Sequence, residues 1–215
     1  WAENSRLYPN IARDVKGVKV NSKAHRGAYL TSDEAQAVLK NIDTETLAGL
    51  RNSAMIALML TAGLRTIDVS TAKIEDITTL GDSNVLYIQR KGHQEKDSYI
   101  KIASVVYEAI TNYLKERNVT DTSEPLFASL SNNNKGGHVT TRTIRGIVKQ
   151  AFKDAGLTNE ALSAHSTRHT SATLNLLNGG TLEETQQLLG HANIETTMIY
   201  AHHLERMKNN SEERI

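Results

Sequence analysis

Two histidines and one arginine stand within five residues in the stretch AHSTRHT at 164–170. His165 and His169 are four residues apart, so on a helix they would share one face, as the zinc ligands of a metalloprotease helix do. Ser166, however, stands where such a helix carries its glutamate base, and no third ligand can be identified. Arg168 follows three residues after His165 and offers a planar fork that matches two phosphate oxygens. The stretch therefore favours an anion over a metal ion, and we expect His169 to face the fold or to support the site from behind its phosphate-binding residues.

Other polar residues with useful chemistry are expected at the ends of regular elements. Arg65 follows a helix that ends at Gly63, Lys91 lies in the turn of a hairpin, His191 follows a helix-ending glycine, and Tyr200 comes nine residues later. Any one of them alone would be a surface side chain or, for the tyrosine, a half-buried aromatic. Side chains at such ends can converge on one point of a rigid scaffold. Together they would bind a phosphate, with Tyr200 as the oxygen nucleophile.

The elements that must position these residues are mostly helices. Apolar residues at helical spacing, capping boxes such as Thr31 with Glu34, and glycine stops predict a mainly α, α+β fold. The expected helices cover about 31–42, 46–62, 104–117, 140–156, 164–178, 181–189 and 196–207. Alternating residues on both sides of KGHQEK predict one small sheet, a two-stranded antiparallel hairpin over 84–102.

Composition limits the classes of protein that remain. The 215 residues, 39% of them hydrophobic, suit one large globular domain. With a formal net charge of +1, any affinity for nucleic acid must come from local clusters of basic residues. The absence of cysteine excludes disulfides, thiolate zinc sites and cysteine nucleophiles. The longest apolar runs are too short to cross a bilayer, so we expect a soluble, cytoplasmic protein without a membrane partner.

Three stretches in order resemble the tyrosine recombinases, the DNA integrases of phages and mobile elements. TAGLRTIDV (61–69) is similar to the first arginine box of that family, AHSTRHTSATLNLLNGG (164–180) to its His-x-x-Arg box, and LLGHANIETTMIYAH (188–202) to its second histidine and tyrosine. The RKGHQEKD hairpin (90–97) resembles the turn that carries the catalytic lysine. The resemblance covers about 26–210. Thr167, where leucine is usual, and Asp68, where glutamate is common, depart from the pattern at positions that do not touch the phosphate.

The resemblance implies a bacterial or phage-encoded site-specific recombinase that integrates and excises a phage or conjugative transposon. Tyr200 would attack a DNA phosphodiester to give a 3′-phosphotyrosyl link and a free 5′-hydroxyl, without ATP, metal or other cofactor. His165 would assist removal of the phenolic proton, and Lys91 would protonate the leaving oxygen.

The other predicted site residues would stabilise the transition state. By the same resemblance, Arg65 and Arg168 would hold the non-bridging oxygens, and His191 would donate a further hydrogen bond. Asp68, one turn after Arg65, is expected to orient its neighbours rather than to act as a base.

The resemblance also implies further chain segments and partners. Residues 1–24, whose first residue is Trp1, would be a linker from a missing N-terminal core-binding domain, and 25–215 the catalytic domain, with a tail from about 203. Leu204 and Met207 would give that tail an apolar contact with a neighbouring protomer. The expected partner is double-stranded DNA, bound by a homotetramer in the synapse and by a monomer in free solution, with accessory DNA-bending or excision factors.

DNA contacts are expected on one helix face. Arg142, Arg145 and Lys149 are spaced to share a face of the helix predicted at 140–156, and 101–150 carries seven basic against four acidic residues. A solvated basic face is common, but on a chain that grips a duplex we expect phosphate contacts here.

Three alternatives remain open at this point. The first is a non-catalytic DNA-binding protein on the same fold. The second is a type IB topoisomerase, which shares the chemistry but exchanges no partner strands. The third, a metal-dependent hydrolase that uses His165 and His169, is disfavoured by the missing base and third ligand.

Overall fold

The computed structural model describes residues 28–90 and 93–208, with side chains through Glu205. The eight α-helices of this part are α1 (Ser32–Lys40), α2 (Leu47–Ala62), α3 (Thr66–Thr71), α4 (Ser104–Glu116), α5 (Thr141–Asp154), α6 (Ala164–Leu177), α7 (Leu182–Leu189) and α8 (Glu195–Lys208). Two short 3-10 helices cover Ile74–Asp76 and Asn132–Asn134. The predicted linker at 1–24, Lys91, and the tail after 208 lie outside the described residues.

Helix ends follow the capping chemistry of the sequence. Thr31 accepts the backbone N–H of Glu34, whose carboxylate accepts the N–H of Thr31 in return, so α1 begins with the predicted capping box. Thr181 and Glu184 cap α7 in the same way. Gly63 ends α2 with φ of 59°, a left-handed conformation that favours glycine. The seven predicted helices are confirmed as α1, α2 and α4 to α8, whereas the six-residue helix α3 after Arg65 was not predicted.

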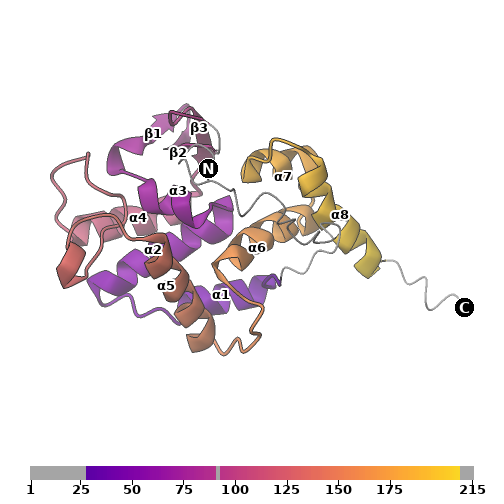
Figure 1. The fold of residues 1–215 in the computed structure, drawn as a ribbon, viewed down its shortest axis with the longest axis horizontal. Helices are drawn as coiled ribbons and strands as arrows, with labels where there is room; N and C mark the ends of the chain where they lie inside the picture. The colour runs from indigo at the N-terminus through magenta and orange to yellow at the C-terminus, as the bar shows by residue number, and fades with distance from the viewer. Residues whose placement is uncertain (1–27, 91–92, 209–215) are drawn as a thin grey trace, which may run out of the picture.

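The core is built around α2. This helix is apolar on all sides, and Met55, Ile56, Leu58 and Met59 have no exposed surface, as is typical of a helix buried on every face. It packs against α4 on one side and α6 on another, while α1 and α5 close the body beneath it (Figure 1). A separate small cluster of Ala172, Leu189 and Tyr200 joins α6, α7 and α8.

The predicted antiparallel hairpin is confirmed as two strands of a three-stranded sheet, whose first strand was not predicted. β1 (Ile77–Leu80) pairs with β2 (Ser83–Ile88), and β2 pairs with β3 (Ser98–Lys101), with Leu86 opposite both Ile77 and Ile100. β1 is only four residues long and mostly exposed, so it lacks the alternation that reveals a strand. Gly81, with φ of 57°, permits the tight turn that joins β1 to β2.

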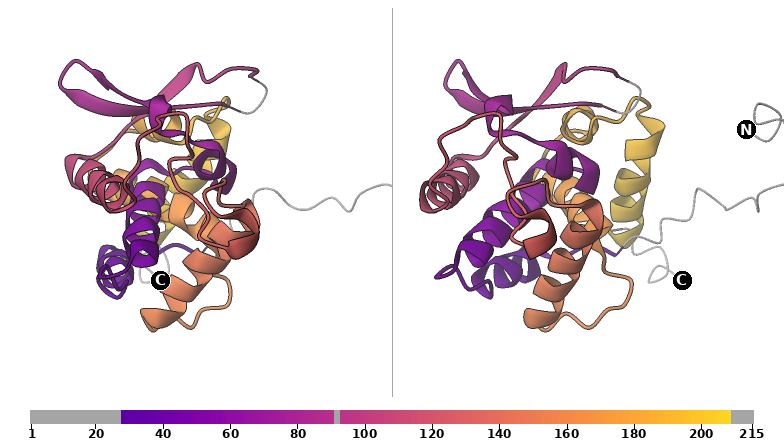
Figure 2. Two further views of the ribbon diagram at one scale, coloured as in Figure 1. Left: turned by 90° about the vertical axis from the view of Figure 1, so that its left-hand side faces the viewer. Right: turned by 60° about the vertical axis from the view of Figure 1, so that its left-hand side comes forward.

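The elements surround a common edge. The sheet lies at one end of the helical body, and α7 and α8 lie beside that body with α6 between them and the core (Figure 2). The loop end of the β2–β3 hairpin, the last turn of α7 and the first turns of α8 therefore approach the N-terminal half of α6. None of the described helices is long and apolar enough to cross a membrane.

Candidate active site

A cavity of about 900 Å³ lies at this meeting point. Five of the six residues predicted to be catalytic line it: Arg65, His165, Arg168, His191 and Tyr200. The sixth, Lys91, lies outside the described residues, but Arg90 immediately before it lines the cavity, as do His93, Asp97 and Tyr99 after it. Segments separated by more than 100 residues of sequence thus converge on one pocket.

Arg168 is held rigidly by main-chain oxygens. Its guanidinium donates to the carbonyl of Gly63 at 2.5 Å and to that of Leu189 at 2.6 Å, and the residue is 2% exposed. Burial, and then repulsion from Arg65, lowers its pKa to about 10, so it remains charged at neutral pH. The C-terminal carbonyls of α2 and α7 therefore fix a cation at the bottom of the pocket, where a helix dipole favours one.

Arg65 is positioned by the start of α3. Its backbone N–H donates to the buried carboxylate of Asp68 at 2.9 Å, which completes the first turn of that helix. The predicted orienting role of Asp68 therefore has a physical basis in this contact with the main chain. The Arg65 side chain, half-buried, faces the same cavity as Arg168.

Arg90 is a third arginine of the pocket and was missed by the sequence analysis. It donates to the Leu189 carbonyl at 3.0 Å, so Arg90 and Arg168 share one acceptor. Its guanidinium lies over Gly190, where an added Cβ would stand 2.0 Å from its Cζ. Gly190 also has φ of 60°, so the glycine both ends α7 and makes room for Arg90. The only signal in the sequence was its position next to Lys91.

His191 is a neutral group in a cationic pocket. Burial, together with Arg168, Arg65 and Arg90, lowers its pKa to about 4. Its Nδ1 lies 2.9 Å from the Thr197 hydroxyl, on the first turns of α8. The other ring nitrogen is thereby left to face the pocket, where a neutral imidazole can donate a hydrogen bond without adding charge.

Tyr200 is buried, and its hydroxyl meets a histidine. The residue is 5% exposed and packs in the cluster with Ala172 and Leu189, and burial raises its pKa although Arg168 opposes this. Its hydroxyl lies 2.8 Å from Nδ1 of His169. The ring of His169 therefore lines the cavity and contacts the predicted nucleophile, rather than facing only the interior of the fold.

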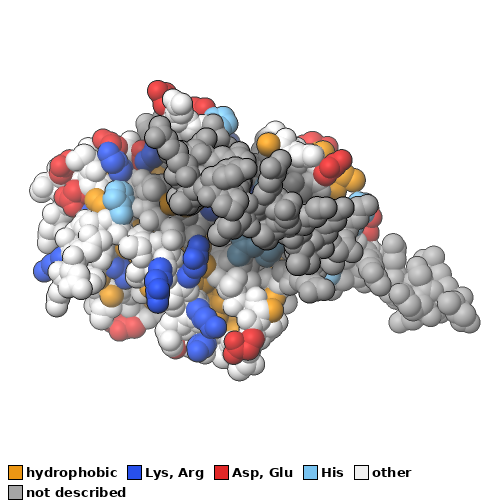
Figure 3. Space-filling model, viewed as in Figure 1, with side chains coloured by type: hydrophobic (Ala, Val, Ile, Leu, Met, Phe, Trp, Pro, Cys, Tyr) orange, Lys and Arg blue, Asp and Glu red, His pale blue; other side chains and the backbone are white. Residues whose placement is uncertain are grey.

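The predicted DNA-contacting residues lie on an adjoining surface. Arg142, Arg145 and Lys149 are exposed on α5, and Figure 3 shows Lys and Arg side chains gathered over this helix. Arg145 and Lys149 line a second cavity of about 590 Å³, whose other walls include Arg65 and His165. The two cavities therefore share two residues, and the basic face of α5 continues into the candidate active site.

Comparison with known proteins identifies relatives over most of the chain. Residues 28–207 match the phage integrase family. The tyrosine recombinase XerC of Halalkalibacterium halodurans is 32% identical over 200 residues, which cover 89% of this chain and 61% of that protein. XerC of Caldanaerobacter subterraneus subsp. tengcongensis is 33% identical over 175 residues, 81% of this chain and 47% of the relative. The chain thus spans less than two thirds of the length of either relative.

Solved structures share the fold. XerA recombinase superimposes with a TM-score of 0.68 at 29% identity, covering 83% of this chain and 61% of that one. XerH bound to its palindromic difH substrate, in a post-cleavage complex, gives a TM-score of 0.76 at 24% identity over 96% of this chain and 58% of that one. These matches confirm both the predicted fold class and the resemblance drawn from the three sequence stretches. The chain belongs to the phage integrase family, with the fold of a tyrosine recombinase catalytic domain.

Proposed function

We propose that this chain is the catalytic part of a site-specific DNA recombinase that cuts and rejoins strands through a 3′-phosphotyrosyl intermediate. The observation that carries the proposal is the pocket itself: a buried tyrosine shares one cavity with three arginines and four histidines. Asp68 is the carboxylate that acts on Arg90 and Arg168, and Asp97, which also lines the cavity, pairs with His93. The arginines outnumber these carboxylates, so the pocket is suited to an anion. A phosphodiester supplies that anion and presents an electrophile to the tyrosine.

Each side chain then has a chemical task. Arg65 and Arg168 would hold the two non-bridging oxygens, and Arg168 would need no reorganisation because its position is already fixed by two carbonyls. His191, neutral at working pH, would donate a hydrogen bond to the same oxygens. Lys91 would protonate the leaving 5′-oxygen, an assignment supported by its neighbour Arg90 in the pocket.

Double-stranded DNA is the proposed substrate, held by phosphate contacts along α5. Arg145 and Lys149 share a cavity with Arg65 and His165, so a strand that enters the active site would continue along their side of the helix. Lys149 also lies 3.6 Å from Glu160, an exposed ion pair that costs little to break.

The proposal also covers the location and assembly of the whole protein. It includes a cytoplasmic protein, an N-terminal core-binding domain joined through residues 1–24, and a tetramer on paired sites in which the tail after 203 contacts a neighbour. Integration and excision of a mobile element, with the help of accessory factors, stay a prediction.

A covalent trap tests the reaction. Nicked duplexes taken from DNA that flanks the gene should give a protein–DNA adduct that survives denaturation, with excess chelator present. Tyr200→Phe should abolish it while keeping the melting temperature within a few degrees, because the ring still packs against Ala172 and Leu189. An adduct that persists in Tyr200→Phe would rule out this nucleophile.

The alternatives give different outcomes in the same assay. A non-catalytic DNA-binding protein would bind the duplexes and form no adduct on any of them. A type IB topoisomerase would form the adduct and relax supercoiled DNA, but would not join strands from two duplexes.

A further inference from the structure

Two histidines of α6, His165 and His169, line the cavity of the proposed nucleophile, Tyr200. His169 contacts the hydroxyl oxygen that would attack the phosphate. Nδ1 of His169 lies 2.8 Å from the Tyr200 hydroxyl, and the two rings are tilted with centroids 5.5 Å apart. His165, one turn earlier, contacts the His169 ring edge-on, with centroids 4.5 Å apart. His169 therefore contacts both His165 and the proposed nucleophile.

The two histidines also differ in how far they are buried. His165 is exposed and lines both the active-site cavity and the cavity of Arg145 and Lys149, so it faces the side from which DNA would approach. His169 is half-buried between His165 and α8. The position of His165 suits a hydrogen bond to DNA phosphate, whereas the position of His169 suits the tyrosine.

The chemistry of the tyrosine calls for such a partner. Burial raises the pKa of the Tyr200 hydroxyl, so the phenol is protonated at neutral pH and must lose its proton as it attacks. A general base has to lie within hydrogen-bond reach of that proton. Nδ1 of His169 already meets this condition in the DNA-free chain.

We propose that His169 is the general base, whose Nδ1 takes the hydroxyl proton of Tyr200 during DNA cleavage. This inference rests on the proposed function and replaces His165 in the role that the family resemblance implied. As the bond from Tyr200 Oη to phosphorus forms, the phenolic proton moves to Nδ1 and His169 becomes an imidazolium. The bond from phosphorus to O5′ breaks, and O5′ receives a proton from the general acid, Lys91. Religation reverses both transfers, so His169 returns the proton to the departing tyrosine.

The hydrogen bond can be checked without DNA. Imidazole nitrogen NMR spectra at neutral pH should show His169 with an unprotonated Nδ1 and a protonated Nε2, and Tyr200→Phe should shift the Nδ1 resonance. A protonated Nδ1 would mean that His169 donates to Tyr200, which overturns the inference and leaves the proposed function intact.

Single-turnover cleavage of the nicked duplex tests the base. His169→Asn keeps a polar atom near the Nδ1 position but cannot accept the proton, so the rate should fall by about 10²- to 10⁴-fold. The wild-type rate should level off as pH rises, once His169 is neutral, while the variant rate should keep rising because hydroxide replaces the base. A duplex with sulfur in place of O5′, a leaving group that needs no protonation, should restore cleavage to Lys91→Ala and leave the His169→Asn defect in place.

Other titratable groups near the site require a matched control. Those that face the pocket are Arg65 before α3, Arg90, His93, Asp97 and Tyr99 from the hairpin, His165 and Arg168 from α6, and His191 after α7. His165→Asn makes the same substitution one turn away and should slow cleavage while keeping the wild-type pH profile. Free imidazole should rescue His169→Ala and not His165→Ala.

The outcomes separate this inference from the proposed function. If wild-type protein forms no adduct on any duplex, both fail. If wild-type protein forms the adduct and His169→Asn retains its rate within about twofold and its pH profile, only the assignment of His169 fails. A pH profile that changes in His165→Asn instead would return the base role to His165.

Discussion

Main-chain oxygens hold two arginines of the pocket, Arg90 and Arg168. Leu189 offers its carbonyl to both Arg90 and Arg168, and Gly190 leaves the space that the Arg90 guanidinium occupies. A carboxylate in that place would neutralise the charge that a phosphate needs. A carbonyl holds the guanidinium with partial charge only, so the cations keep their attraction for an anion.

Gly190→Ala tests this arrangement at the scale of one atom. A Cβ at Gly190 would stand 2.0 Å from Arg90 Cζ, and the residue has φ of 60°. We expect the free energy of unfolding to fall by about 1–3 kcal/mol and DNA cleavage to slow by about 10- to 100-fold, because Arg90 is displaced. Urea denaturation and single-turnover cleavage measure the two effects.

Gly156→Ala is the matched control. Gly156 also has a positive φ, of 77°, but an added Cβ would meet nothing within 4 Å. It should lose similar stability and no cleavage activity. Equal loss of cleavage in both variants would show that backbone strain, and not the displacement of Arg90, is responsible.

At the scale of elements, α6 connects the candidate active site to the segment that precedes α1. Arg168 points to α2 and α7, His169 points to α8, and the next residue, Thr170, accepts the buried N–H of Leu30 at 2.9 Å. Tyr29 in turn contacts His203 of α8, with ring centroids 6.2 Å apart. The segment that enters the domain is thus fastened to the helices that carry the predicted catalytic residues.

Thr170→Val removes one of these fastenings. The two side chains have nearly the same shape, but valine leaves the Leu30 N–H buried without its acceptor, so we expect a loss of about 1–3 kcal/mol in the free energy of unfolding. Thr111→Val on α4 is the control. Thr111 and Thr170 each donate to the carbonyl four residues earlier, but Thr111 is exposed. Urea denaturation should show little change in the control, and equal losses in both would contradict the role of the Leu30 contact.

The predictability of the elements depended on how local their causes are. Capping boxes and glycine stops act within four residues, which is why the bounds of α1, α2 and α7 could be predicted. β1 was missed although Gly81 and Asp82 form a two-residue turn signal that could have revealed it. The partner of His169 was not predictable, because it depends on how α8 packs against α6, and no local pattern encodes that packing.

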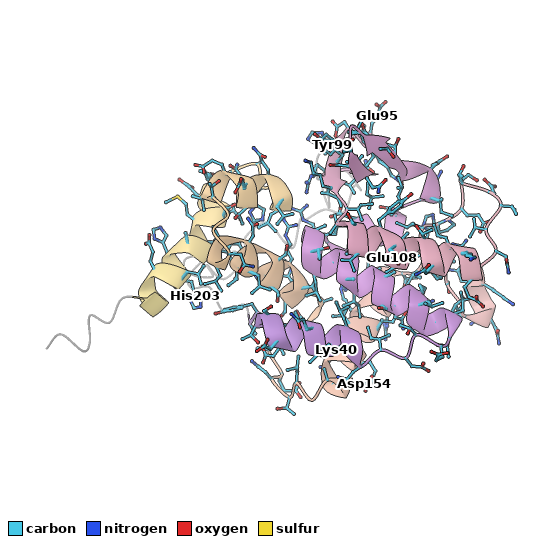
Figure 4. All side chains as sticks on the ribbon, turned by 180° about the vertical axis from the view of Figure 1, so that it is seen from behind. Lys40, Glu95, Tyr99, Glu108, Asp154 and His203 are labelled. Atoms are coloured by element: carbon cyan, nitrogen blue, oxygen red, sulfur yellow. The ribbon has the colours of Figure 1, made fainter. Side chains whose placement is uncertain are left out.

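At the scale of the whole molecule, a chain of nearly neutral net charge places basic residues beside its candidate active site. Arg145 and Lys149 adjoin the active site, whereas Glu108 and Asp154 lie with Lys40 on the view from behind in Figure 4. Contacts of Arg145 and Lys149 with DNA stay a prediction.

Salt dependence of DNA binding tests the basic face. Arg145→Gln and Lys149→Gln should each weaken binding and lower the slope of log affinity against log salt by about 1, since each removes one phosphate contact. Lys40→Gln, an equal change of charge on α1, should leave the slope unchanged. A similar loss in all three variants would indicate that net charge, and not this face, governs binding.

The double use of the Leu189 carbonyl has a consequence for how substitutions affect the site. No side-chain replacement at 63 or 189 deletes an acceptor, because every residue type carries the same main-chain oxygen. The arginines therefore keep both acceptors when these side chains change, yet they are sensitive to any movement of the end of α7, such as the one that a Cβ at Gly63 would cause 2.8 Å from Leu189 Cδ2. A displacement of that end would shift Arg90 and Arg168 together, so inactivating changes should be sought in the packing beneath α7, at residues that never meet DNA.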